Sequence, residues 1–375
     1  MYEKKRILQV GYASLAKAGI QAVIMNIARG VKDDFDIDVL LTSNNPGYYD
    51  EEFLNYGRIY RINCDVSGCA LRRYLLYSIR PFKQFFCSYR LLKRNQYDIV
   101  HLHGETNVWP IFLAAKFARV KHIIAHSHNT ASPEKRPLIF RLYKKLGKWV
   151  INKCSTVKMG VSMDAIAHLY GAGNGILLNN PVEIDRFANA KAYEKKADVN
   201  LVNVGRYDYQ KNQSFIIDIT KCFVDKGYFV KTQLIGFGEE KEMLKKQIAD
   251  LNINGAVELI QGNGDVDIPR LLVSADLFVF PSRYEGLGIV ALEAQAAGLL
   301  CLASDVVPKE TDVGLCEYMS LSEPALVWAE KIISMIQNRD NYKLDYDALN
   351  SFKAENIQKE ICQFYKTLIN AEIDQ

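Results

Sequence analysis

Two carboxylates, Glu285 and Glu293, flank a glycine-containing loop and the expected start of a helix. The apolar run 275–280 before the loop predicts a buried strand of a parallel sheet. The helix formers of 289–297 predict a helix whose N-terminal amide groups and positive dipole end suit a phosphate. Carboxylates repel phosphate, whereas sugar and ribose hydroxyls can donate hydrogen bonds to them. The stretch therefore indicates a site for a nucleotide sugar.

The spacing of these glutamates resembles the E-x7-E motif of the retaining glycosyltransferases of family 4, which have the GT-B fold. The amino-acid sequence from Ser282 to Gly298 is particularly similar to that of the bacterial exopolysaccharide and capsule branch of the family. The resemblance implies that Glu285 contacts hydroxyls of the donor sugar and Glu293 those of the ribose. It also implies that backbone amides between them help to hold the diphosphate, at Gly286, Leu287 and Gly288.

Arg206 and Lys211 follow the expected strand 199–205. An Arg and a Lys after a strand are ordinarily surface charges, but the resemblance implies that these two residues bind the donor diphosphate. Two cations already in place at this point would stabilise the negative charge that develops as a nucleoside diphosphate leaves.

In the first half of the chain, a strand at 6–10 precedes a loop that ends at Gly19. The resemblance implies that Gly19 also contacts the donor. Only one of the family's two adjacent glycines is kept there, and the loop lacks the G-x-G-x-x-G pattern of a nicotinamide dinucleotide site.

Four of the six histidines lie near the ends of two expected strands, 98–104 and 122–129. Alternation along each strand puts its two histidines on one side of the sheet. A zinc site is conceivable, but the spacing does not require the three converging ligands that catalytic zinc needs. We expect two of the four in the core and two lining the ligand crevice, and the resemblance makes His128 the residue that faces the reacting sugar. The expected core pair is His101 and His126, and the expected crevice pair is His103 and His128.

The chain of 375 residues is long enough for two domains, each with its own core. Alternating strand and helix patterns predict the α/β class. The resemblance implies a GT-B fold, with two doubly wound Rossmann-like domains facing a central cleft and a C-terminal helix that crosses back to the first domain. We expect residues 1–187 to form the acceptor-side domain, joined by the helix at 355–375, and residues 188–354 to form the domain that binds the nucleotide-sugar donor.

The net charge of +4 conceals a basic first half and an acidic second half. The segments 71–94 and 141–153 interleave basic with aromatic and leucine residues, and Pro81 is expected to break the first of them into two helices. Such segments suit an anionic membrane surface, with ordinary surface helices as the alternative. No apolar run is long enough to span a bilayer, no signal peptide is recognised, and the eight cysteines form no C-x-x-C pair. We therefore expect a cytoplasmic protein, with peripheral attachment at the inner face of the plasma membrane left open.

The function that the resemblance implies is a retaining, hexosyltransferase-type transfer of a sugar from a nucleotide donor, a UDP-sugar by expectation, to a hydroxyl acceptor. A lipid-linked glycan intermediate of exopolysaccharide or capsule synthesis is the expected acceptor. No metal ion or other cofactor is expected, and the basic residues belong to no recognisable nucleic-acid module. Two alternatives stay open: a nucleotide-sugar epimerase or hydrolase, and a non-catalytic nucleotide-sugar-binding protein. The loop 132–137 is assigned to the acceptor and the loop 263–265 to the nucleobase.

Overall fold

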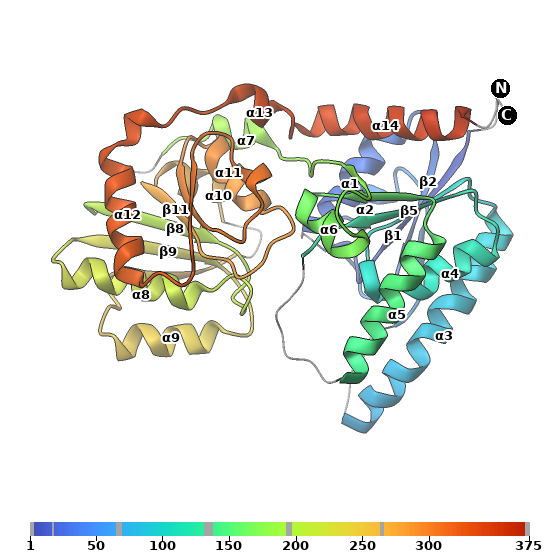
Figure 1. The fold of residues 1–375 in the computed structure, drawn as a ribbon, viewed down its shortest axis with the longest axis horizontal. Helices are drawn as coiled ribbons and strands as arrows, with labels where there is room; N and C mark the ends of the chain where they lie inside the picture. Colours follow the sequence, from blue (N-terminus) through green and yellow to red (C-terminus); the bar gives the residue numbers. More distant parts are fainter. Residues whose placement is uncertain are drawn as a thin grey trace. The chain divides into compact units, whose positions relative to one another are not determined.

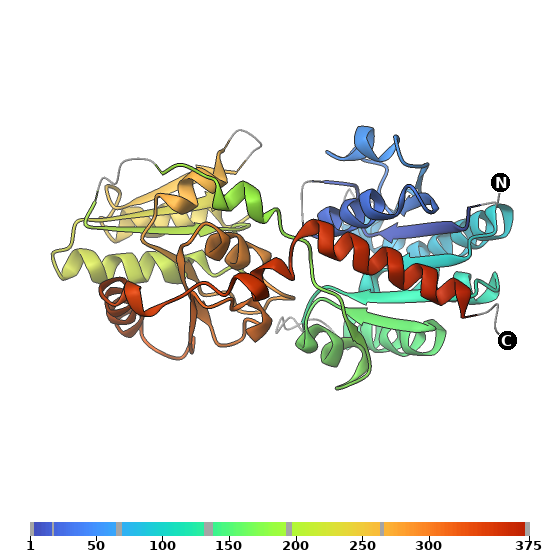
Figure 2. The same ribbon diagram turned by 90° about the horizontal axis from the view of Figure 1, so that it is seen from above.

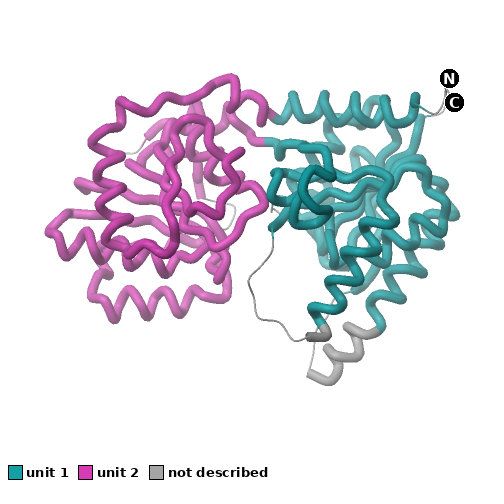
Figure 3. Tube along the Cα trace, viewed as in Figure 1, with its two compact units in different colours: residues 1–181, 354–375 teal, residues 182–353 magenta. Residues whose placement is uncertain are grey.

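A computed structural model describes residues 4–16, 19–64, 70–130, 138–192, 197–262 and 266–371, without the side chains of 70–78 and 138–139. The chain divides into two compact units, shown in different colours in Figure 3. Unit 1 comprises residues 1–181 and 354–375, and unit 2 comprises residues 182–353. The division falls a few residues before the boundary expected from the sequence, because the short helix α7 (Ile184–Ala188) packs against helices of unit 2.

Unit 1 is built on a parallel sheet of seven strands in the order β3-β2-β1-β4-β5-β6-β7. The order reverses between β1 and β4, the position at which doubly wound sheets bind their ligands. The strands are β1 (Arg6–Gly11), β2 (Asp36–Leu41), β3 (Ile59–Arg61), β4 (Ile99–Leu102), β5 (His122–Ser127), β6 (Val157–Gly160) and β7 (Ile176–Leu177).

Helices cover both faces of this sheet, so its strands β1, β2, β4 and β5 are almost uninterrupted runs of buried residues. One core lies between the sheet and α3, α4, α5 and α6, and a second lies between the sheet and α1 and α14 (Figure 1). The helices of unit 1 are α1 (Gly19–Val31), α2 (Asp50–Phe53), α3 (Ala70–Asn95), α4 (Trp109–Phe117), α5 (Leu138–Cys154), α6 (Met163–Tyr170) and α14 (Ala354–Asn370), with a 3-10 turn at Glu105–Asn107.

The C-terminal helix α14 returns to unit 1, as the resemblance implied. It packs beside α1 and lies along the sheet in Figure 2. Its apolar face recurs at three- and four-residue spacing and buries Ile357, Ile361 and Tyr365. Lys366 adds a surface ion pair with Asp34 at 2.7 Å. The last helix therefore completes the second core of unit 1.

The expectation that Pro81 splits the segment 71–94 is wrong, because α3 runs through it as one helix. A proline inside a helix removes one backbone hydrogen bond and crowds the preceding turn, at a cost of about 3 kcal/mol. The half of α3 after Pro81 buries Gln84, Ser88 and Leu92 and packs against α4, and this packing offsets the cost. No helix in the described part of the chain is both long and apolar enough to cross a membrane.

Unit 2 contains a six-stranded parallel sheet in the order β10-β9-β8-β11-β12-β13, which reverses between β8 and β11. Helices α8, α9 and α12 pack together on one side of it, and α7, α10 and α11 form a second group (Figure 1). The strands are β8 (Val199–Val204), β9 (Val230–Gly236), β10 (Val257–Gln261), β11 (Leu277–Phe280), β12 (Leu300–Ser304) and β13 (Cys316–Met319). The remaining helices are α8 (Gln213–Asp225), α9 (Lys241–Asp250), α10 (Ile268–Val273), α11 (Ile289–Ala296), α12 (Ala325–Gln337) and α13 (Tyr346–Asn350), with 3-10 turns at Lys309–Thr311 and Arg339–Asn341.

Candidate active site

Two loops of unit 2 meet at the reversal point of its sheet. The loop 205–212 leaves the carboxyl end of β8, and the loop 281–288 leaves the carboxyl end of the neighbouring strand β11. Asn212 joins them, because its side-chain amide donates to the carbonyl of Pro281 at 3.1 Å and accepts from Arg283 at 2.7 Å. Tyr207 anchors the first loop by donating its hydroxyl to the carbonyls of Leu234 and Ile260. The sheet thus holds both loops at the edge where α/β proteins place ligands.

The two loops bring Lys211 and Glu285 into a buried ion pair. Lys211 Nζ lies 2.6 Å from Glu285 Oε1, and the two side chains are 14% and 7% exposed. Lys211 also lies over the ring of Phe280, 5.1 Å from its centroid. Gly205 makes room for this side chain, since a Cβ there would lie 3.1 Å from the Lys211 stem. The sequence assigned the two residues to different parts of a donor, and the structure makes them direct partners.

Arg206 lies apart from this buried pair, with its side chain 63% exposed. Its guanidinium contacts Asp208 Oδ2 at 2.9 Å, and the other oxygen of Asp208 accepts from the backbone amide of Lys211 at 3.1 Å. Asp208 therefore ties the two basic residues of the loop together. Nothing in the sequence singled out Asp208 beyond its position between them.

The loop after β11 leads into α11 through glycines. Gly288 caps the helix with a left-handed backbone, φ +92°, and a Cβ there would lie 2.9 Å from the Phe280 ring. No side chain caps this helix terminus, whose first amides point away from the helix. The buried residues Gly286 and Leu287 precede it, and the hydroxyl of Thr311 donates to the carbonyl of Leu287.

Glu293 lies inside α11, on a helix that contacts α7 and α10. Burial raises the pKa of Glu293 to about 7, while Arg186 lowers it and Glu183 raises it further. The carboxyl therefore changes charge near neutral pH, which makes its ionisation sensitive to any ligand that donates hydrogen bonds to it.

In unit 1, Gly19 is exposed and begins α1. His128 directly follows β5 at its carboxyl end and is buried. Burial lowers the pKa of His128 to about 3. The histidine that would contact the reacting sugar, by resemblance, is thus neutral at ordinary pH.

All four strand-end histidines are buried, so the expectation that His103 lines a crevice is wrong. Alternation puts them on the sheet face that α1 and α14 cover, and the imidazole rings stack there, with His101 and His103 4.2 Å apart at an interplanar angle of 25°. Burial lowers the pKa of His101, His103 and His126 well below the usual range, and the neighbouring histidines lower it further. The cluster is therefore a neutral one.

Ring nitrogens of His101, His103 and His126 lie within 4.8 Å of one another, a grouping that could hold a metal ion. Imidazole lone pairs lie in the ring plane, however, and the His101 ring is stacked on those of His103 and His126 at interplanar angles of 25° and 19°. The lone pairs of stacked rings lie side by side and do not point toward one metal position. Hydrogen bonds between the rings also occupy nitrogens that a metal would need, with His101 Nε2 3.1 Å from His126 Nδ1 and His103 Nδ1 2.9 Å from His128 Nε2. The arrangement favours a hydrogen-bonded cluster over a metal centre.

Glu105 is a residue of this region that the sequence reasoning missed. Its carboxylate accepts from the backbone amides of His128 at 2.9 Å and Asn129 at 2.8 Å, and so holds the end of β5 in place. Its own backbone is left-handed, with φ +47°, a conformation that non-glycine residues retain only when their surroundings impose it. Burial raises the pKa of Glu105, and the two amide hydrogen bonds oppose that shift. The available signal was its position at the carboxyl end of a strand, directly after Gly104.

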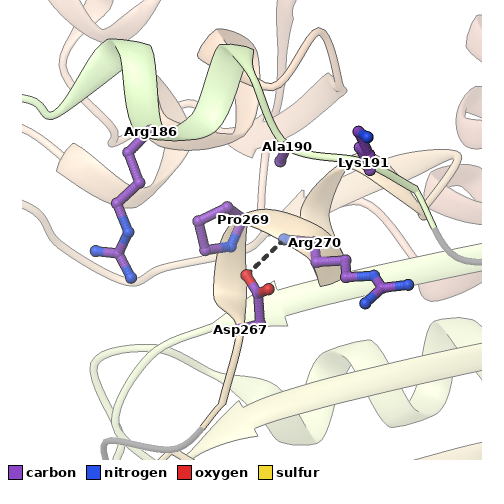
Figure 4. A pocket seen from close by; sticks show the side chains of 6 residues that line it. All are labelled: Arg186, Ala190, Lys191, Asp267, Pro269 and Arg270. Carbon is purple, nitrogen blue, oxygen red and sulfur yellow. Dashed lines mark hydrogen bonds between the residues drawn. The ribbon is translucent and has the colours of Figure 1, made fainter.

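A pocket of about 360 Å³ lies elsewhere in unit 2, between α7 and α10. Figure 4 shows its lining, and none of the site residues predicted from the sequence is among the residues drawn.

The loops 132–137 and 263–265, which the sequence assigned to the acceptor and the nucleobase, lie outside the described residues.

Comparison with known families supplies the class of protein. Residues 18–158 match the family described as Glycosyltransferase Family 4, and residues 158–343 match the family described as Glycosyl transferases group 1. The two matches are contiguous and together extend over both units. The chain belongs to glycosyltransferase family 4 and is a glycosyltransferase with the GT-B fold.

Similar curated proteins are named as glycosyltransferases, and the name of one places it in capsular polysaccharide synthesis. EpsF of Bacillus subtilis, named as a glycosyltransferase, is 29% identical over 88% of this chain and 87% of its own length. The capsular polysaccharide biosynthesis glycosyltransferase CapH of Staphylococcus aureus is 24% identical over 95% of this chain and 98% of its own. An Escherichia coli UDP-Gal:alpha-D-GlcNAc-diphosphoundecaprenol alpha-1,3-galactosyltransferase is 29% identical over 61% of this chain and 63% of its own.

Solved structures share the fold. HepE of Anabaena, determined with UDP and with UDP-glucose, superposes with TM-scores of 0.73 and 0.74 at 16% identity, covering 96% of this chain. Sucrose-phosphate synthase of Thermosynechococcus elongatus gives a TM-score of 0.76 at 16% identity, over 98% of this chain. The prediction of two Rossmann-like domains is confirmed.

Proposed function

We propose that this glycosyltransferase moves a sugar from a UDP-sugar, with retention at the anomeric carbon, to a hydroxyl of a lipid-linked glycan in exopolysaccharide or capsule synthesis. Similar proteins support the choice, since HepE was determined with UDP-glucose and the Escherichia coli relative is named for UDP-Gal and a diphosphoundecaprenol acceptor. The shared fold alone supports only the class of enzyme.

The observation that carries the proposal is the buried Lys211–Glu285 pair at the point where the sheet of unit 2 reverses. A lysine ammonium has three donors, so Lys211 can keep its bond to Glu285 and still bind a diphosphate oxygen. The uncapped start of α11 adds further amide donors for the same anion. Glu285 would then accept hydrogen bonds from the donor sugar, and Glu293 from the ribose.

In this proposal the chain's own groups stabilise the leaving diphosphate, so no metal ion takes part. Lys211, Arg206 and the amides of Gly286 to Gly288 would carry the negative charge that develops on the leaving oxygen. That oxygen can take the proton of the incoming hydroxyl when attack occurs on the same face, which requires no protein base. We propose that His128 contacts the reacting sugar and that Gly19 approaches the donor.

Because no metal ion takes part in this proposal, turnover should be unchanged by EDTA. Loss of turnover that Mg²⁺ restores would contradict metal independence.

The decisive experiment supplies the full chain with a panel of nucleotide sugars and follows thermal stabilisation and release of the nucleoside diphosphate. The proposal predicts stabilisation by UDP-sugars and release that depends on an added lipid-diphosphate glycan acceptor. Release of free sugar without an acceptor would favour a hydrolase, and tight binding without any release would favour a binding protein.

Unit 1 also offers a surface suited to a membrane-bound acceptor. Large apolar side chains are exposed on α3 and α5, including Ile79, Phe82, Phe86, Leu146 and Trp149. Exposed basic residues lie on the same helices, at Lys83, Arg90, Lys93, Arg94, Lys144 and Lys145. Apolar side chains beside lysine and arginine bind at the boundary between lipid tails and anionic headgroups. We therefore propose that α3 and α5 attach the enzyme to an anionic membrane.

Sedimentation with phosphatidylglycerol vesicles tests this attachment. The wild type should cosediment and Phe82→Ser/Trp149→Ser should not, whereas the control Phe229→Ser, at an exposed site in unit 2, should behave as wild type. Equal cosedimentation of the double variant would contradict the proposal.

A further inference from the structure

Six buried side chains form one continuous hydrogen-bonded chain in unit 1. Four of them lie on β1, β4, β5 and α14, and the other two directly follow β4 and β5. Each member contacts the next, and the chain runs from beneath the C-terminal helix to His128 at the end of β5. In order, the members are His126, His101, Tyr365, Gln9, His103 and His128.

The amide of Gln9 gives the half that ends at His128 a direction. Gln9 Nε2 donates to the hydroxyl of Tyr365 at 3.0 Å, so Gln9 Oε1 must accept, and it lies 2.6 Å from His103 Nε2. His103 therefore carries its hydrogen on Nε2, and its Nδ1 is an acceptor. His128 Nε2, 2.9 Å from that Nδ1, must then be the donor. The remaining nitrogen of His128, Nδ1, has a lone pair and no hydrogen.

The hydroxyl of Tyr365 joins this half of the chain to the half that contains His101 and His126. It accepts from Gln9 and can therefore donate to His101 Nδ1, 2.6 Å away, after which His101 Nε2 donates to His126 Nδ1 at 3.1 Å. With the hydroxyl in place, a reversal must turn the Gln9 amide and move the hydrogens of His101 and His126 as well as those of His103 and His128. Without the hydroxyl, Gln9 could turn over alone, and only His103 and His128 would change tautomer. A single group on the last helix thus couples the tautomer of His128 to the rest of the chain.

We propose that Gln9 and Tyr365 are positioning residues, which hold His128 as the Nε2–H tautomer so that Nδ1 accepts a hydrogen bond from a hydroxyl of the substrate. The inference rests on the proposed function, because only there does His128 contact the sugar. Neither positioning residue touches substrate, since both are fully buried beside the sheet. The C-terminal helix therefore packs against the sheet of unit 1 and, through the hydroxyl of Tyr365, also influences which nitrogen of His128 carries the hydrogen.

Side-chain NMR of the ¹⁵N-histidine-labelled full chain tests the tautomer directly. The His128 signals are assigned by their loss in His128→Asn. In the wild type they should show hydrogen on Nε2, and in Tyr365→Phe they should show a mixture of both tautomers. The matched control is Tyr97→Phe, which also removes a buried hydroxyl of unit 1, one bonded to Asp38 at 2.6 Å outside the chain of histidines. It should leave the His128 signals unchanged.

A wild-type His128 with hydrogen on Nδ1, or an unchanged His128 tautomer in Tyr365→Phe, would overturn the proposal. If Tyr365→Phe does not fold, Gln9→Met replaces it, because methionine keeps the volume and removes both amide contacts. That variant should also yield mixed His128 tautomers.

Turnover of a UDP-sugar provides a second readout that packing alone would not produce. Tyr365→Phe should lower kcat on the order of tenfold and leave the KM for the donor unchanged. The control Tyr97→Phe should have the kcat and KM of the wild type. Equal losses in both variants would assign the effect to stability and overturn the positioning role. A wild type that turns over no UDP-sugar would instead refute the proposed function, and the NMR result would still decide the tautomer.

Discussion

At the scale of single residues, the proposed donor site of unit 2 depends on two charges that share one buried position. Lys211 and Glu285 are each other's partner at 2.6 Å, so each limits the cost of burying the other. A substitution at either residue therefore affects stability as well as ligand binding. The two effects can be separated by comparing single and double variants.

We predict that Lys211→Met destabilises unit 2 by about 3–5 kcal/mol, because it leaves Glu285 buried without a cation. The double variant Lys211→Met/Glu285→Gln should recover most of that loss, since it removes both charges. Denaturant unfolding followed by the fluorescence of Trp328, buried in the core of unit 2, measures the change. The control Lys221→Met breaks an exposed ion pair of α8 and should change stability by less than about 1 kcal/mol. A double variant no more stable than Lys211→Met would contradict this account.

Glu293 gives the site a dependence on pH. Its pKa of about 7 in the free protein means that it is largely protonated below pH 7. Ribose hydroxyls that donate to the carboxylate stabilise the ionised form, so binding lowers this pKa and releases a proton. The affinity for UDP should therefore rise by up to about tenfold per pH unit as the pH approaches 7 from below, and level off above it.

Titration calorimetry with UDP at pH 5.5, 6.5 and 7.5 checks this prediction. Glu293→Gln cannot ionise and should lose that part of the pH dependence, which also corrects for the titration of UDP itself. Parallel pH profiles for the two proteins would rule out a ribose contact by Glu293.

At the scale of elements, α11 depends on glycines at both of its ends. Gly288 and Gly298 are left-handed, with φ +92° and +72°, but only Gly288 is crowded, by the Phe280 ring. Gly298→Ala should cost about 1–2 kcal/mol for its backbone conformation alone. Gly288→Ala should cost about 1–3 kcal/mol more, since its Cβ must displace Phe280. Trp328 fluorescence during denaturation measures both, and equal losses would show that the contact with Phe280 adds no strain.

Strand and helix patterns predicted the α/β class, because periodic burial is recorded in the sequence. The resemblance implied the two Rossmann-like domains and the helix that returns to the first. Other features could not be read in this way. The stability of α3 through Pro81 depends on its packing against α4, which no local pattern reports. The pairing of Lys211 with Glu285 and the joining of Tyr365 to Gln9 connect residues far apart in the chain, so their partners emerge only from the fold. Asp208 and Glu105 act through backbone amides, a contact that leaves no motif.

At the scale of the whole molecule, the four buried histidines make stability depend on pH. Their pKa values are lowered in the folded chain, and in the unfolded chain they return to about 6.5. Above pH 6.5 both states are neutral and the histidines have no effect. As the pH falls below 6.5, only the unfolded state gains protons, so the folded state loses stability by up to about 1.4 kcal/mol per pH unit for each histidine.

We therefore predict that the chain is markedly less stable at pH 5.5 than at pH 7.5. Denaturant unfolding at both values measures the difference. His126→Gln removes one of the four titrations and should reduce the difference by about 1 kcal/mol. A pH difference that is the same in wild type and His126→Gln would contradict the burial of a neutral cluster.

The central claim is that Lys211, held in its buried pair with Glu285, binds the diphosphate of a nucleotide sugar. Calorimetric titration of UDP into the full chain tests it most directly, with Lys211→Met/Glu285→Gln as the test variant and Lys221→Met as the control. The account predicts that the wild type and Lys221→Met bind UDP equally and that the double variant, still folded, binds at least about tenfold more weakly, a loss of about 1.4 kcal/mol. Unchanged UDP affinity in a folded double variant would contradict it.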